Sequence, residues 1–123
     1  MTQGKEKPIE WIGTTLEDLK KFPKEVRCEV GYALDTAQNG DKADNVKPLK
    51  GIITGSGILE IIERFDGDTY RAVYTVRFKD IIYALHAFKK KSKQGKETPK
   101  LDIELIKARY KRAKAMYQIR LEQ

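Results

Sequence analysis

The chain has 123 residues, a length typical of one domain, and at this size folding buries about two-thirds of the surface of the unfolded chain. The single cysteine, Cys28, has no partner for an internal disulfide, and one histidine with one cysteine excludes the usual four-ligand zinc site. No apolar stretch reaches the roughly 18 residues of a membrane helix, and no signal peptide opens the chain. We therefore expect one cytoplasmic domain over residues 1–123, without a membrane association, a metal or a cofactor.

The excess of positive over negative charge lies in the C-terminal part of the chain. Residues 1–88 have a net charge of −1, whereas residues 89–123 hold 12 basic and 4 acidic side chains, a net charge of +8. A block of this kind is typical of a protein that binds a polyanion, either a nucleic acid or an acidic protein. The alternative is a basic helix that is only solvated.

The first 40 residues predict one strand and two helices. Residues 1–7 are polar and expected to be disordered, and residues 8–13 form a short strand. Thr14 and Thr15, followed by Glu17 and Asp18, predict a capped helix start. Pro23 ends this helix and begins a second one. The apolar positions of the second helix keep helical spacing up to the stop at residues 39–40: Val26, Val30, Leu34 and Ala37.

The remaining residues predict a long loop, three strands and a helix. Residues 40–57 form the loop, and residues 58–65, 70–78 and 81–88 form an antiparallel meander. Residues 89–97 form a basic linker, and residues 98–118 form a helix that starts at Thr98-Pro99. The helix buries Ile106, Tyr110, Ala113 and Tyr117. The fold class is therefore α+β, in the order β-α-α-β-β-β-α, with a small sheet rich in antiparallel pairs.

Turn geometry assigns side chains to the two faces of this sheet. Phe65 is expected opposite Asp68, and Phe78 opposite Ile81. The core face under the helices then holds mostly apolar residues: Leu59, Ile61, Ala72, Tyr74, Val76, Tyr83, Leu85 and Ala87. The other face is mixed: Glu60, Ile62, Arg64, Arg71, Val73, Thr75, Arg77, Ala84, His86 and Phe88.

This second face is expected to be a cationic concavity. It carries Arg64, Arg71 and His86, and its last strand runs into Lys89, Lys90, Lys91 and Lys93. Arginine and lysine suit phosphate groups and the extra charge of a phosphoryl transition state, and histidine can transfer a proton to or from a ribose hydroxyl. The alternatives are ordinary solvent-facing charges, a solvated linker and a histidine that only fills the sheet.

Several motifs together resemble the HigB-type toxins of the RelE/ParE superfamily, in particular their phage-derived branch. The matching segments are WIGTTL at 11–16, FP at 22–23 with GYAL at 31–34, RAVY at 71–74, and LHAFKKK at 85–91 running to the Thr-Pro at 98–99. The resemblance covers about residues 9–112. It implies a RelE-like fold, with the same order of elements as predicted above.

The resemblance implies a toxin of a type II toxin–antitoxin system, a metal-independent endoribonuclease (mRNA interferase). Such a toxin enters the A site of the small ribosomal subunit, contacts ribosomal RNA and cuts messenger RNA by attack of the ribose 2′-hydroxyl. Arg71 would stabilise the phosphorane, Lys90 would neutralise charge, and His86 would transfer protons. Arg64, Lys89, Lys91 and Lys93 would contact phosphates.

The resemblance also implies an antitoxin partner, usually a helix-turn-helix protein of the HigA type. Two alternatives stay open. One is the ParE branch, which inhibits DNA gyrase by binding and cuts nothing, and the other is an inactive RNA-binding or regulatory module of the same fold.

Overall fold

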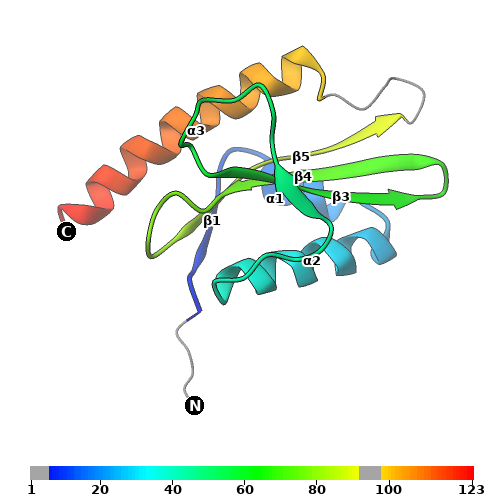
Figure 1. Ribbon diagram of the computed structural model, residues 1–123, viewed down its shortest axis with the longest axis horizontal. Coiled ribbons are helices and arrows are strands. Elements are labelled where there is room, and N and C mark those ends of the chain that lie inside the picture. Colours follow the sequence, from blue (N-terminus) through cyan, green and yellow to red (C-terminus); the bar gives the residue numbers. More distant parts are fainter. Residues whose placement is uncertain (1–5, 92–97) are drawn as a thin grey trace.

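The computed structural model describes residues 6–91 and 98–123. In them a five-stranded sheet lies between helices on both of its faces (Figure 1). The elements in chain order are β1 (Ile9–Trp11), α1 (Thr15–Lys20), α2 (Lys24–Gln38), β2 (Val46–Pro48), β3 (Ile58–Phe65), β4 (Asp68–Thr75), β5 (Ile82–Lys91) and α3 (Lys100–Leu121). The fold is mixed α+β, as predicted, but it has one strand more than predicted.

The additional strand, β2, lies in the segment that the sequence predicted to be a loop. It pairs with the edge of β3, with Val46 opposite Ile61. Three residues are too few to show the alternation of apolar and polar side chains that identifies a strand in a sequence. The segment is a strand because it forms hydrogen bonds with the free edge of β3. The sheet order is β1-β5-β4-β3-β2, and β1 runs parallel to β5 while the other pairs are antiparallel.

The hairpin between β3 and β4 has the predicted register, with Phe65 opposite Asp68. Its two turn residues, Asp66 and Gly67, have φ angles of 51° and 83°. Both values lie in the left-handed region that a two-residue hairpin turn requires, and glycine reaches it without a steric penalty.

The pairing of β4 with β5 differs from the prediction beyond Val73. Val73 lies opposite His86 as expected, but Tyr74 lies opposite Ala84, so Leu85 is the extra residue of a β-bulge. The predicted core face is therefore wrong for Tyr83 and Leu85, which pack on the α3 side of the sheet. In addition, β4 ends at Thr75, and residues 89–91 belong to β5 rather than to a linker.

Helices α1 and α2 cover one face of the sheet. The predicted apolar stripe of α2 is buried there against Ile61, Ala72 and Tyr74. Thr14 is the N-cap residue of α1, but its hydroxyl donates to Asp18 Oδ2 (2.8 Å) and caps no backbone N–H, so the predicted capping box does not form.

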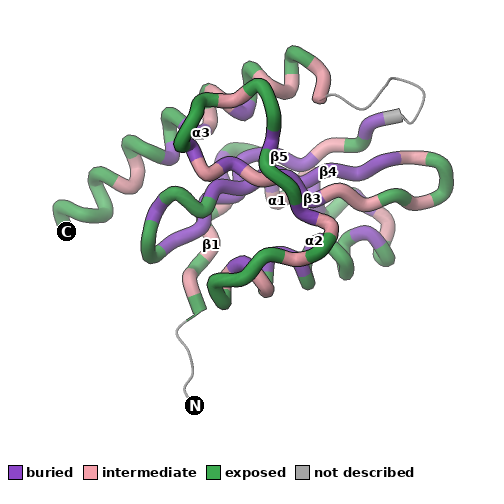
Figure 2. The backbone as a smooth tube through the Cα atoms, viewed as in Figure 1, coloured by how far each residue is buried: buried purple, intermediate pink, exposed green. Residues whose placement is uncertain are grey.

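Helix α3 covers the opposite face, which the sequence predicted to be an open concavity. Ile106, Tyr110 and Ala113 are buried, as predicted, but against this face rather than against the predicted core face, and Tyr117 is half-buried. Buried residues therefore run through the sheet between two covering layers (Figure 2). No helix in residues 6–91 and 98–123 combines the length and the apolar character needed to cross a membrane.

Candidate functional site

Two buried residues of neighbouring strands form an ion pair beneath α3. Arg71 of β4 and Glu60 of β3 are 5% and 3% exposed, and Arg71 Nη1 lies 2.9 Å from Glu60 Oε1. Thr98, just before α3, donates a hydrogen bond from its hydroxyl to Glu60 Oε2 (3.3 Å). A buried charge is costly unless it is paired, and in this pair each side chain offsets the charge of the other.

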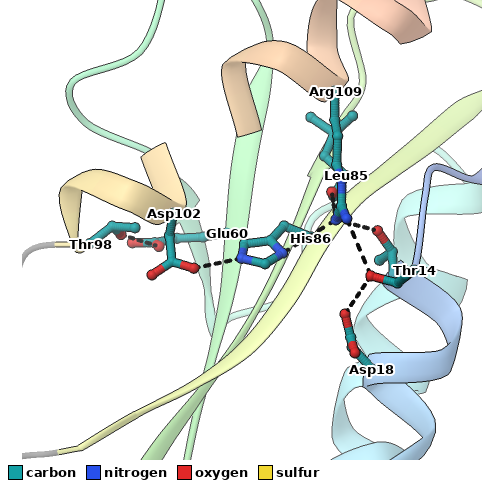
Figure 3. A network of polar contacts seen from close by, with 9 residues as sticks. Thr14, Asp18, Glu60, Leu85, His86, Thr98, Asp102 and Arg109 are labelled. Atoms are coloured by element: carbon teal, nitrogen blue, oxygen red, sulfur yellow. Dashed lines mark hydrogen bonds and ion pairs between the residues drawn. The ribbon is translucent and has the colours of Figure 1, made fainter. Parts of the chain in front are cut away.

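His86 of β5 is held between two side chains of α3. Its Nε2 lies 2.7 Å from Asp102 Oδ1, and its Nδ1 lies 3.4 Å from Arg109 Nη1 (Figure 3). A guanidinium has only donors, so in the neutral ring Nδ1 accepts from Arg109 and Nε2–H donates to Asp102. The ring also stacks on Phe88, with centroids 4.8 Å apart. The contacts thus fix both the orientation and the tautomer of His86.

Arg109 joins α3 to the bulge and to the start of α1. Its Nη1 donates to the carbonyl of Leu85 (2.9 Å) and to the hydroxyl of Thr15 (3.3 Å), and its Nη2 donates to the hydroxyl of Thr14 (3.2 Å) (Figure 3). Burial lowers the pKa of Arg109, partly offset by Asp18 and reinforced by Arg112. Arginine stays protonated nonetheless, so it remains a donor to the bulge.

Gly13 makes room for this arginine. Its φ is +60°, and a Cβ at this position would lie 2.9 Å from Arg109 Nη2. A side chain here would therefore meet both backbone strain and a clash with the guanidinium.

The structure places the three predicted catalytic residues on one face of the sheet. Arg71 lies opposite Phe88, His86 lies opposite Val73, and Lys90 lies opposite Thr69. The prediction that this face is exposed is wrong, because α3 packs over it: Arg71, His86 and Lys90 are 5%, 6% and 3% exposed.

The predicted phosphate-binding residues do not form one group. Arg64 is exposed and lies opposite Thr69, in the same row of the sheet as Lys90. Lys89 lies in the row of Tyr70, on the face that α2 covers, and its Nζ is 3.6 Å from Asp68 Oδ2. Lys91 is the last residue of β5, and Lys93 lies outside the described residues.

Glu60 is the residue that the sequence analysis placed on this face without giving it a role. It lies opposite Val73 on β4, and Val73 lies opposite His86 on β5. Glu60 and His86 therefore occupy one row across three strands and flank a small apolar side chain. Since neighbouring strands are about 4.8 Å apart, the backbones of Glu60 and His86 are separated by about 10 Å. This row brings a carboxylate and an imidazole to either side of one position, with the Arg71 guanidinium beside them.

Asp102 and Arg109 were also missed as site residues. The signal that places them is the helical spacing with the predicted inner residues, since 102, 106, 109 and 113 lie along one stripe of α3. Sequence patterning alone did not say which surface that stripe covers.

Tyr74 lies on the other face of the sheet and does not belong to this group. Burial raises the pKa of its hydroxyl to about 12, so the phenol stays neutral at physiological pH. Within residues 6–91 and 98–123, no group of three or more histidine, cysteine or acidic side chains is placed to hold a metal ion.

Comparisons with known proteins give one family match and one structural match. The family model described as Phage derived protein Gp49-like (DUF891) matches residues 17–111. A comparison with curated protein sequences found no match. Among solved structures, a chain of the crystal structure of the toxin-antitoxin complex RelBE2 from Mycobacterium tuberculosis matches with 17% identity and a TM-score of 0.46, over 69% of this chain and 99% of that chain. This similarity is too weak to carry an argument about function.

Proposed function

Because the chain belongs to the phage-derived Gp49-like family, we propose that it is a HigB-type toxin that cleaves messenger RNA in the ribosomal A site. The observation that supports this best is the row of Glu60 and His86 with Arg71 beside it. A base, an acid and a fixed positive charge are what metal-independent cleavage of RNA needs. The resemblance of residues 85–91 to HigB-type toxins supports the same function.

In the proposed reaction a phosphate lies over Val73, between Glu60 and His86. Glu60 takes the proton of the ribose 2′-hydroxyl, whose oxygen attacks the adjacent phosphorus. Arg71 stabilises the extra negative charge of the five-coordinate transition state. His86, protonated on both ring nitrogens in the reacting state, gives its Nε2 proton to the leaving 5′-oxygen and is left as a neutral ring. The products are a 2′,3′-cyclic phosphate and a 5′-hydroxyl, so no metal and no water enter this step.

Substrate can reach this row only after the first turn of α3 moves away from β5. The Nε2–H group of His86 is hydrogen-bonded to Asp102, and one carboxylate oxygen of Glu60 accepts a hydrogen bond from Thr98, so neither group is available to a substrate. Once α3 has moved, Arg64 and Lys90, two basic side chains of the row beyond Arg71, would face the RNA backbone, with Lys90 as the charge-neutralising group. Lys89, Lys91 and Lys93 would supply further phosphate contacts near the end of β5.

As a toxin that acts on ribosomes, the protein would work in the cytoplasm and contact ribosomal RNA. It would be kept inactive by an antitoxin, for which a helix-turn-helix protein of the HigA type is our candidate. The net charge of +8 in residues 89–123 favours an acidic or charge-complementary surface on that antitoxin.

The test is a map of 5′ ends on a translated reporter messenger and on an untranslated copy, after brief induction of the protein. The informative variant is Glu60→Gln, which keeps the shape of the side chain and removes the base. Because it also removes the charged partner of Arg71, its folded state is checked by urea unfolding before cutting is measured. Glu29→Gln, at an exposed position on α2, is the matched control. We expect codon-phased cuts in the translated copy with the wild type and with Glu29→Gln, and a loss of cutting of at least about 100-fold with Glu60→Gln.

The burial of Arg71, His86 and Lys90 favours a second candidate function, a non-enzymatic inhibitor or RNA-binding module of the same fold. Growth arrest without cuts in either messenger would support an inhibitor of the gyrase-binding kind. Cutting that persists in Glu60→Gln would contradict the assigned base while leaving the nuclease in place.

A further inference from the structure

A cleft of about 730 Å³ opens beside the buried row and plays no part in the chemistry described so far. Its lining residues come from β2 and the segment that follows it, from strand β3, and from the start of α3 and the residue just before it. Its volume is within the range of about 300–1,000 Å³ that is typical of ligand sites. Glu60 belongs both to the lining of this cleft and to the ion pair with Arg71, so the cleft is continuous with the proposed reacting row.

Lysine side chains line this cleft from both sides. Lys47 and Lys50 come from β2 and the residues after it, and Lys100 comes from the first turn of α3. All three are exposed, and within the described part of the chain none of them forms an ion pair. The two carboxylates of the lining are already matched: Glu60 by Arg71, and Glu104 by Lys107 at 3.8 Å. The cleft therefore has an excess of positive charge.

The walls of the cleft also offer apolar surface and free backbone donors. Leu49 and Ile103 contribute apolar side chains, which suit the face of a base or a ribose. The N-cap residue of α3, Pro99, has no side chain that caps the first N–H groups of the helix. The positive end of the helix dipole thus adds to the charge of Lys100.

We propose that this cleft, with Lys47, Lys50 and Lys100 around it and Glu60 at its inner end, binds the single-stranded RNA segment next to the bond that is cut. The proposal rests on the proposed nuclease function and adds the site at which the substrate first binds, before the first turn of α3 moves away from β5. RNA is favoured over an acidic peptide because apolar walls accompany the lysines, and because a strand in the cleft would bring a ribose hydroxyl to Glu60.

The experiment measures binding directly, without ribosomes, using the purified full-length protein and a labelled single-stranded RNA of about six nucleotides. The cleft variant is Lys47→Glu with Lys50→Glu. The control variant, Lys20→Glu with Lys24→Glu, changes the net charge equally at exposed positions of α1 and α2, on the other side of the sheet. For the cleft variant we expect an affinity loss on the order of 10-fold at 0.1 M salt, and a slope of log K against log salt that is smaller by about 1.4. The control should bind like the wild type.

The same binding measurement is made with a hexaglutamate peptide. Three outcomes would overturn the proposal: the wild type binds no RNA at low salt, the cleft variant and the control lose RNA affinity equally, or the cleft variant loses affinity for hexaglutamate and binds RNA like the wild type. The last would assign the cleft to an acidic peptide. Mapping of messenger cuts in the same variants separates this proposal from the nuclease. If the cleft variant loses RNA affinity and the wild type cuts no messenger, the cleft is an RNA-binding site but the proposed nuclease function is wrong. If the wild type cuts and the cleft variant binds and cuts equally well, only the RNA path is wrong.

Discussion

Arg71 and Glu60 form an ion pair in which both charged side chains lie almost entirely out of water. Their side chains are 6% and 4% exposed, and the nearest oxygen–nitrogen distance is 2.9 Å. Removing two charges from water costs several kcal/mol each, and only mutual attraction with further hydrogen bonds offsets that cost. Such a pair therefore contributes little net stability, but the loss of one partner leaves an uncompensated buried charge.

The burial of the Arg71–Glu60 ion pair predicts the outcome of a double-mutant cycle on these two residues. Arg71→Met strands the Glu60 carboxylate and should lower the free energy of unfolding by about 3–5 kcal/mol. The double variant Glu60→Gln with Arg71→Met should recover most of that loss, because no buried charge remains. Urea unfolding at neutral pH measures each variant. Arg64→Met, at an exposed position of the same hairpin, should stay within about 0.5 kcal/mol of the wild type. If the double variant is as unstable as Arg71→Met, packing rather than charge explains the effect.

At the scale of elements, α3 is both part of the core and part of the site. Ile106, Tyr110 and Ala113 pack on the sheet, while Asp102 and Arg109 hold the two ring nitrogens of His86. The helix that stabilises this face also hides it. Access to His86 therefore depends on how firmly the first turn of α3 is attached to β5.

Asp102→Ala tests this dependence. Loss of a hydrogen bond to a charged group costs about 1.5–3 kcal/mol, so the first turn should leave β5 more often. We expect the initial rate of codon-phased cutting to rise, by about 10-fold or more, with some loss of stability. Glu29→Ala, at an exposed position of α2 on the other side of the sheet, is the control and should cut like the wild type. Slower cutting by Asp102→Ala would mean that Asp102 assists His86 in the reaction instead of blocking it.

The predictability of this fold varies from element to element. The β3–β4 register follows from local sequence, since the Asp66-Gly67 turn fixes it. The bulge at Leu85 does not, because it depends on a carbonyl contact with Arg109, which is 24 residues away. Sequence patterning grouped Arg71 and His86 on one face correctly, but it treated that face as open. The reason is that the period of α3 says which side of the helix is apolar and nothing about the surface it meets.

At the scale of the whole molecule, the outer surface of α3 is more positively charged than the rest of the chain. The net charge of +8 in residues 89–123 contrasts with −1 before them, and Lys111, Arg112 and Lys114 are exposed on α3. Both faces of the sheet are covered, so a large polyanion would first meet these helix side chains and the lysines around the cleft. The long-range attraction of a polyanion, which in the proposed function is the ribosome, is thus expected on the same side of the molecule as the proposed RNA path.

Association with ribosomes should accordingly depend steeply on salt and on α3. A protein that neutralises several phosphates releases counterions, so its affinity falls by orders of magnitude between low and moderate salt. Co-sedimentation of the full-length protein with ribosomes over a series of KCl concentrations measures this. We expect Lys111→Glu with Lys114→Glu to release the protein at lower KCl than the wild type, while Lys20→Glu with Lys24→Glu, with the same change in net charge, releases it at nearly the wild-type concentration. Release that is insensitive to salt, or equal in the two variants, would mean that ribosome association does not use the basic surface of α3.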